Sequence, residues 1–245
     1  MSNPLSGIAF MLKGLRLIFH PNIRRFVIIP LLINISLFVA LIVFGANQLE
    51  VFVDWIMPEV PSWLQWISWL LWLVFTTIAL LIVFFSFSLL ANLLGAPFNG
   101  PLAAAVEKHL TGIAPEGDPS QNFMANIVPS ILGELKKLMY FALLAIPLLV
   151  LFFIPVINIA APFLWFIFTA WMLALEYIDY PAGNHDMLFS DQKKLLSRRS
   201  FQSLGFGSVV SIMTFIPIAN FIVMPTAVAA ATVYWVEKLK DSEKL

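Results

Sequence analysis

The feature that most constrains this chain is its long stretches without a charged residue. Residues 26–46 and 67–97 contain no Asp, Glu, Lys or Arg, whereas about a quarter of the residues in soluble domains are charged. An α-helix rises about 1.5 Å per residue, so either stretch can cross a hydrocarbon core of about 30 Å. Of all 245 residues, 60% are hydrophobic and 11% charged, which is more apolar surface than a soluble fold of this size can bury. The sequence therefore predicts an all-α integral membrane protein with a single membrane domain, residues 1–245.

Two long transmembrane helices are predicted, at residues 26–53 and 67–97. Before the first, apolar residues recur every three or four positions from Leu5 to Phe19, which predicts an amphipathic helix over residues 4–19 that lies at the membrane interface. After the second, five Gly, Pro and Asn residues fall within residues 95–101. These residue types favour turns, so we expect the helix to break there and a new one to begin near Pro101.

Two further apolar stretches, residues 138–178 and 204–236, are interrupted by prolines and share a short repeat. Residues 153–158 read FIPVIN and residues 215–220 read FIPIAN. The arm over residues 204–216 is about 20 Å long if helical, too short for a full span. We interpret both stretches as re-entrant helical hairpins that turn at Pro-x-x-Asn inside the membrane. Two ordinary hairpins with external turns are the alternative.

The distribution of charge predicts the orientation. All 14 basic residues lie in residues 1–25, 98–137, 179–203 and 237–245, and the connection over residues 47–66 carries only acidic charges. The positive-inside rule then places both termini, residues 98–137 and residues 179–203 in the cytoplasm. Full spans and same-side hairpins both satisfy this pattern.

Arg24 and Arg25 stand at the start of the first predicted span, just after Asn22 and Ile23. A helix start offers free N–H groups and a positive dipole end, and arginine adds planar donors that suit tetrahedral oxyanions. These four residues are the candidate anion site. An arginine pair that merely sets topology among lipid headgroups is the alternative.

Other candidate residues carry weaker signals. Asn99 and Glu107, the latter with its neighbours Lys108 and His109, are candidates for a polar vestibule beside the arginine pair. Glu176 and Asp179 either serve a proton relay or mark where a helix leaves the membrane. Small residues are candidates for close helix contacts, either inside the protein or between subunits: Gly205, Gly207, Ala227, Ala229, Ala230 and Ala231.

Several chemistries find no support. The chain has no cysteine and three dispersed histidines, so no metal site is predicted. It has no P-loop, G-x-S-x-G or H-E-x-x-H motif, so neither an enzyme nor a bound cofactor is expected. The net formal charge is zero, and no nucleic-acid partner is implied.

Two motifs resemble those of the bacterial CysZ sulfate permeases. Residues 14–34 read GLRLIFHPNIRRFVIIPLLIN and are similar to the opening of that family, and residues 95–107, GAPFNGPLAAAVE, match a second family motif. The resemblance covers nearly the whole chain. It implies an inner-membrane protein that admits sulfate for cysteine synthesis, built from two long transmembrane helices and hemi-penetrating hairpins and assembled as a homo-oligomer.

The resemblance also implies a sulfate site. The family's Gly-Leu-Arg-Arg stretch aligns with residues 22–25, where Asn22 replaces the glycine. Gly14, Leu15 and Arg16 also read Gly-Leu-Arg, so they form a second candidate. We favour Arg24 and Arg25.

The leading functional hypothesis is sulfate uptake along a protein-lined path. The alternative is a non-transporting membrane scaffold or regulatory subunit with a structural anion site. Passive and proton-coupled transport, and passage of sulfite or other oxyanions, stay open at this stage.

Overall fold

The computed structural model describes residues 5–33, 35–37, 39–40, 43, 63, 65–115 and 123–240, and every regular element in these ranges is helical. The chain divides into two compact units, residues 1–27 with 99–245, and residues 28–98. The all-α prediction is confirmed for the described residues. The prediction of a single membrane domain stays a prediction.

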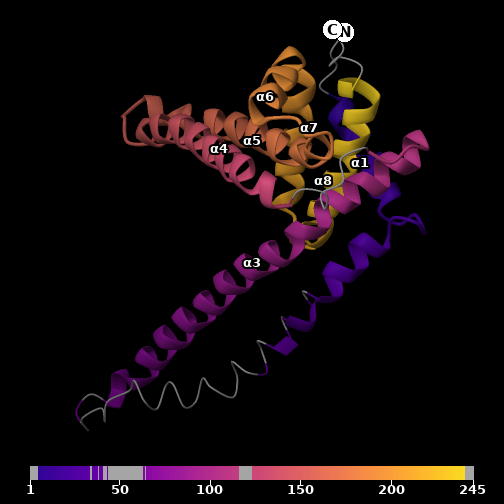
Figure 1. Ribbon diagram of the computed structural model, residues 1–245. Coiled ribbons are helices and arrows are strands. Elements are labelled where there is room, and N and C mark those ends of the chain that lie inside the picture. The colour runs from indigo at the N-terminus through magenta and orange to yellow at the C-terminus, as the bar shows by residue number, and fades with distance from the viewer. Residues whose placement is uncertain are drawn as a thin grey trace. The chain divides into compact units, whose positions relative to one another are not determined.

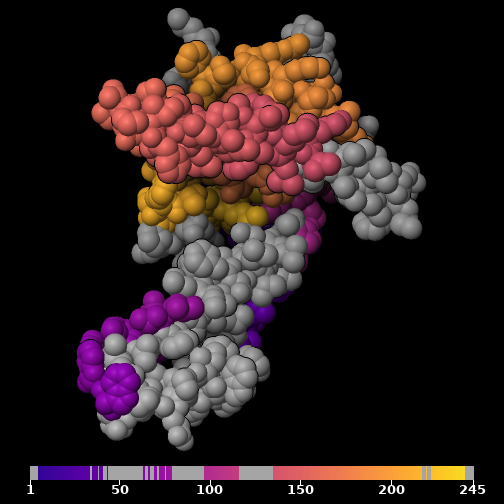
Figure 2. Space-filling view, turned by 90° about the vertical axis from the view of Figure 1, so that its left-hand side faces the viewer, coloured from indigo at the N-terminus to yellow at the C-terminus, as the bar shows by residue number. Residues whose placement is uncertain are grey.

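The first unit is a bundle of helices (Figure 1). It holds α1 (Ser6–Leu17), the end of α3 (Gln65–Thr111), α4 (Phe123–Leu151), a short 3-10 helix η2 (Ile157–Ile159), α5 (Ala161–Gly183), α6 (Phe189–Arg198), α7 (Ser200–Thr214) and α8 (Pro217–Tyr234), which continues as the π-helix η3 (Trp235–Leu239). Figure 2 shows the described part of α4 as a continuous band across one face of this unit.

Each of the two stretches predicted as hairpins contains two helices joined by a turn, with other boundaries than expected, and the insertion of these helix pairs into the membrane stays a prediction. The first joins α4 to α5 through residues 152–160, and its turn contains Val156, whose φ is positive at 72°. Its first arm begins at Phe123 rather than at residue 138. The second turn lies at residues 215–216, earlier than predicted, because Pro217 is already the first residue of α8, a position where its missing N–H costs nothing.

Among the residues that the structure describes, two helices are by length and composition apolar enough to cross a membrane: Ala161–Gly183 and Ile222–Leu239. Both begin in the stretches that the sequence assigns to hairpins and end three to five residues beyond them. Half of the predicted span 26–53 falls outside the described residues, and its described residues, 26–33, 35–37, 39–40 and 43, are helical. The predicted span 67–97 lies within α3.

The expected break near Pro101 is wrong, because α3 runs without interruption from Gln65 to Thr111. A proline removes one helical hydrogen bond and bends the helix, but it does not force the chain to leave the helix when its surroundings support it. Here the Nδ2 atom of Asn184, which follows α5, donates to the carbonyl oxygen of Gly100 at 3.1 Å. This hydrogen bond attaches the proline-containing segment of α3 to the end of α5.

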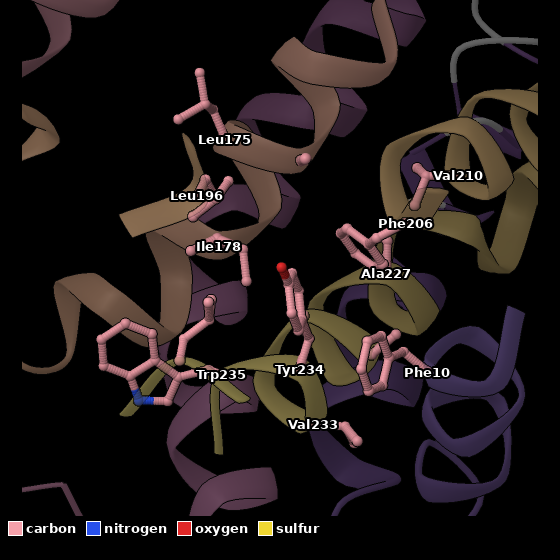
Figure 3. Packing of buried hydrophobic residues seen from close by; sticks show 14 of the residues in the cluster. Phe10, Leu175, Ile178, Leu196, Phe206, Val210, Ala227, Val233, Tyr234 and Trp235 are labelled. Carbon is pink, nitrogen blue, oxygen red and sulfur yellow. The ribbon is translucent and has the colours of Figure 1, made fainter. Parts of the chain in front are cut away.

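The core of the first unit surrounds α8. Residues 227–231 of α8 are fully buried, and Figure 3 shows Tyr234 beside Phe10 of α1 and Phe206 of α7. The rings of Phe10 and Tyr234 stack with centroids 4.9 Å apart. Side chains larger than glycine do not fit where these helices cross. A Cβ atom at Gly7 would lie 2.5 Å from the backbone of Gly205, and a Cβ atom at Gly207 would overlap the backbone of Ala170. The small residues singled out in the sequence therefore serve internal packing.

Helix α1 has two apolar faces, of which the sequence pattern revealed one. The predicted face, which includes Leu5, Ile8 and Leu12, is exposed, and its contact with the membrane interface stays a prediction. The opposite face packs against α7 and α8.

Candidate functional site

The segment between α1 and the next helix folds into a tight turn around His20. The carbonyl oxygen of His20 accepts hydrogen bonds from the backbone N–H groups of both Ile23 and Arg24, each at 2.9 Å. The backbone nitrogen of Asn22 lies 3.5 Å from Nδ1 of the His20 ring, a long and therefore weak hydrogen bond. Pro21 fits the turn because it has no N–H to satisfy.

Ile23 fastens this turn to the bundle. Its side chain is fully buried and packs in a cluster with residues from α3 and α8, among them Leu102, Val106 and Val228. The turn is thus held against the last three turns of α3, while the side chains of Arg24 and Arg25 remain exposed. The guanidinium carbon of Arg25 lies 4.8 Å from the centroid of the Phe26 ring.

A cavity of about 470 Å³ lies between the turn and α3. Pro21, Asn22 and Arg25 line it from the turn, and Ala105, Lys108 and His109 line it from α3. The ring of His109 lies 4.1 Å, centroid to centroid, from that of His20. The lining holds two cations and no carboxylate. Such a set of donors without acidic neighbours favours a small oxyanion.

The sequence-predicted residues take different places around this cavity. Asn22 and Arg25 line it, and Arg24 is exposed next to them without lining it. Ile23 contributes a buried anchor, and its N–H group already has the His20 carbonyl as acceptor. The structure therefore brings together part of the predicted quartet.

The second candidate stretch, residues 14–16, is part of helix α1 and does not line the cavity. Gly14 lies against α8, where an added Cβ would come within 2.6 Å of the Thr226 carbonyl oxygen. Leu15 packs against the same cluster as Ile23, and Arg16 is exposed. Gly14 and Leu15 therefore pack against other helices, whereas Arg16 is exposed.

Glu107 lies on the opposite side of α3 from the cavity, which corrects the expectation that it shares a vestibule with Lys108 and His109. Its side chain is 1% exposed. Nε2 of His185 lies 2.9 Å and 3.0 Å from the two carboxylate oxygens, and Nζ of Lys240 donates to one of them at 2.9 Å. A carboxylate only accepts, so Nε2 of His185 carries the proton. The His185 ring stacks on Trp235 with centroids 5.4 Å apart.

Asn99 and Asp179 also occupy structural positions. Asn99 is buried near the contact between Gly100 and Asn184 and does not line the cavity. Asp179 pairs with Lys137 of α4 and accepts a hydrogen bond from Gln192 of α6 at 2.7 Å, so it joins three helices. No group of three or more metal-ligating side chains occurs in the described part of the chain.

The sequence pattern did not identify Lys108 and His109 as ligands at the arginine site. It also gave no role to His20 in the turn, or to His185 and Lys240 as partners of Glu107. Residues 25 and 108 are separated by more than eighty positions, and Glu107 and Lys240 by 133. The one local signal was the polar triplet at residues 107–109. A helix turns by about 100° per residue, so adjacent residues of such a triplet face different sides.

A family model described as "Sulfate transporter CysZ/Etoposide-induced protein 2.4" matches residues 10–225. The chain belongs to this family. Among its relatives, a protein named sulfate transporter CysZ from Pseudomonas fluorescens (strain Pf0-1) is 43% identical over 235 residues, which cover 96% of this chain and 94% of that protein. Another of the same name from Pseudomonas aeruginosa (strain LESB58) is 40% identical, with 96% of each chain covered. The family resemblance predicted from residues 14–34 and 95–107 is confirmed.

Proposed function

We propose that this protein is a sulfate permease of the bacterial inner membrane that supplies sulfur for cysteine biosynthesis. The observation that carries the proposal is the cavity lined by Arg25, Lys108 and Asn22 without a carboxylate. The two relatives described above are both named sulfate transporter CysZ, which supports sulfate as the anion.

In this proposal Arg25 is the principal ligand. Its guanidinium offers up to five N–H donors in a planar fork that matches two oxygens of a tetrahedral anion. Lys108 adds a point charge from the other wall, and the Asn22 amide adds neutral donors. Arg24 contributes charge from the adjacent surface, while Ile23 holds the turn in place.

The anion then passes along a protein-lined path, and the protein works as a homo-oligomer. The alternative is a scaffold or regulatory subunit that binds an anion without moving it. Uptake of labelled sulfate into liposomes that contain only this protein separates the two. We expect uptake well above that of empty liposomes; uptake equal to theirs, with sulfate still bound by the purified protein, would favour the scaffold.

We further propose that both termini face the cytoplasm and that the hairpin tips end inside the membrane. Support comes from the basic residues, which lie outside the predicted spans and hairpins, and from the tips, where Phe153, Val156 and Phe215 are each more than 80% exposed. Exposed apolar side chains at a helix turn are stable when lipid covers them.

Single cysteines test this topology, because the chain has none of its own. We expect a cysteine at Asn158 or at Asn220 to react slowly with a membrane-impermeant reagent added from the periplasmic side. Rapid labelling from that side would show that the hairpins cross the membrane completely.

A further inference from the structure

A smaller cavity, of about 140 Å³, lies among α4, α5 and α6 and shares no lining residue with the anion cavity. These three helices pack against one another, and Figure 1 shows α4 and α5 side by side. Lys137 of α4 and Glu176 of α5 give this hairpin cavity one charge of each sign. Apolar side chains form much of the remaining wall: Leu138, Phe141, Met172 and Phe189.

The two charged residues of the hairpin cavity stand at the two ends of an uncharged stretch. Residues 138–175 contain no Asp, Glu, Lys or Arg, so Lys137 is the last charged residue before the turn between α4 and α5, and Glu176 is the first after it. The fold brings both back to one place. With this helix pair in the membrane, as proposed above, the hairpin cavity lies where the hydrocarbon core meets the lipid headgroups.

Contacts among the three helices hold the rim of the hairpin cavity in place. Nζ of Lys137 lies 2.5 Å from a carboxylate oxygen of Asp179, and the lysine side chain is only 13% exposed. Lys193 of α6 places its Nζ 4.8 Å from the centroid of the Tyr140 ring. That ring meets Phe189 edge-on, with centroids 5.8 Å apart. A ligand therefore meets groups that are already ordered, which lowers the entropic cost of binding.

Lys137 and Glu176 can each serve a ligand together with a protein partner. A lysine ammonium has three N–H donors and a carboxylate has about four acceptor sites, so a single partner does not saturate either group. Glu176 is exposed. A molecule with an anionic group for Lys137 and an N–H donor for Glu176 matches this pair of charges.

We propose that the hairpin cavity binds a phospholipid whose zwitterionic headgroup carries a primary ammonium. Glu176 accepts hydrogen bonds from the ammonium, and Lys137 donates to the phosphate. One acyl chain lies on Leu138 and Phe141, which are 63% and 42% exposed. A purely anionic headgroup has no cation for Glu176, and a quaternary ammonium has no N–H to donate. The proposal rests on the membrane placement proposed above and not on the sulfate site.

A lipid series tests the headgroup without changing the protein. Phosphatidylethanolamine, its monomethyl and dimethyl derivatives and phosphatidylcholine, all with the same acyl chains, differ in the number of N–H donors. Native mass spectrometry of the purified protein with equimolar lipid pairs compares how much of each lipid is retained. We expect retention to fall with each methyl group, and phosphatidylethanolamine to exceed phosphatidylcholine and phosphatidylglycerol roughly three- to tenfold. Equal retention across the series overturns the proposal.

Glu176→Gln removes the charge and keeps the size of the side chain. We expect this variant to retain phosphatidylethanolamine and phosphatidylcholine almost equally. Asp186→Asn is the matched control, because Asp186 is an exposed carboxylate that does not line the hairpin cavity, and it should keep the native preference. Each variant is compared between two lipids, so a general loss of stability does not imitate the effect. A native preference in Glu176→Gln overturns the assignment.

A phosphatidylethanolamine with a photoreactive acyl chain locates the lipid. We expect cross-links to the segment of α4 that contains Leu138 and Phe141, whereas cross-links confined to other helices overturn the proposal. A second copy of the chain over the hairpin cavity is the other occupant to exclude. It would join Leu138→Cys chains through a disulfide and leave no lipid preference, which also overturns the proposal. Sulfate binding is measured separately, so either site can fail while the other stands.

Discussion

The charged residues on the two sides of the last turns of α3 differ in burial and in their partners. On one side Lys108, with Arg25, lines an open cavity that contains no carboxylate. On the other side Glu107 is buried and satisfied by His185 and Lys240. Positive charge gathered at a surface cavity without a described counter-ion can serve a ligand, whereas a buried charge with two partners serves the fold. The comparison predicts that substitutions on the two sides affect different measurements.

Glu107→Ala should produce the largest effect, and on stability. Breaking a buried ion pair commonly costs about 3–5 kcal/mol, and we expect about 2–4 kcal/mol here, because Lys240 is 40% exposed and water can solvate it. Thermal unfolding of the purified protein in detergent measures the loss. A melting temperature equal to that of the native chain would show that the ion pairs of Glu107 do not stabilise the fold.

Arg25→Ala should instead reduce sulfate binding and leave the melting temperature nearly unchanged. A charge-assisted hydrogen bond contributes about 1.5–3 kcal/mol, so affinity should fall roughly 10- to 150-fold, at 1.4 kcal/mol per decade. Arg25→Lys should recover part of the affinity, because lysine keeps the charge but loses the planar fork. Full recovery with lysine would favour a role in topology.

Lys108→Ala should weaken sulfate binding less, roughly three- to tenfold, because an exposed lysine acts as a mobile point charge and an exposed charge pair contributes about 1 kcal/mol. Titration at low and at moderate salt checks this assignment. The difference from the native chain should shrink as salt screens the charge. A difference that salt leaves unchanged would show that Lys108 acts through packing.

Arg16→Ala should have the smallest effect, less than twofold on sulfate affinity. Arg16 is exposed on α1 and does not line the cavity. It was a candidate ligand only because residues 14–16 read Gly-Leu-Arg. A loss of affinity comparable to that of Arg25→Ala would move the site to α1.

The same comparison explains what the sequence could predict. Asn22, Arg24 and Arg25 could be named as candidates because they are close together and precede an uncharged stretch, so a local pattern sufficed, and two of them, Asn22 and Arg25, line the cavity. Lys108 and His109 reach the site only because Ile23 packs against Leu102 and Val106, and no local pattern encodes that contact.

The predicted helix break over residues 95–101 was wrong for a related reason. The Gly, Pro and Asn residues over 95–101 favour a turn locally, yet α3 continues through them, with Asn184 from a distant part of the chain bonded to Gly100. Tertiary contacts outweigh local turn preference there, and they also shape α1, whose glycine face lies against other helices.

The most direct test of the account is a crystal structure of the protein with selenate, a tetrahedral dianion whose selenium is located by anomalous scattering. The account predicts a selenium peak in the cavity between the turn and α3, with selenate oxygens within hydrogen-bond distance of Arg25 and Lys108. A peak beside Arg16, or a cavity without selenate at concentrations that saturate binding in solution, would contradict it.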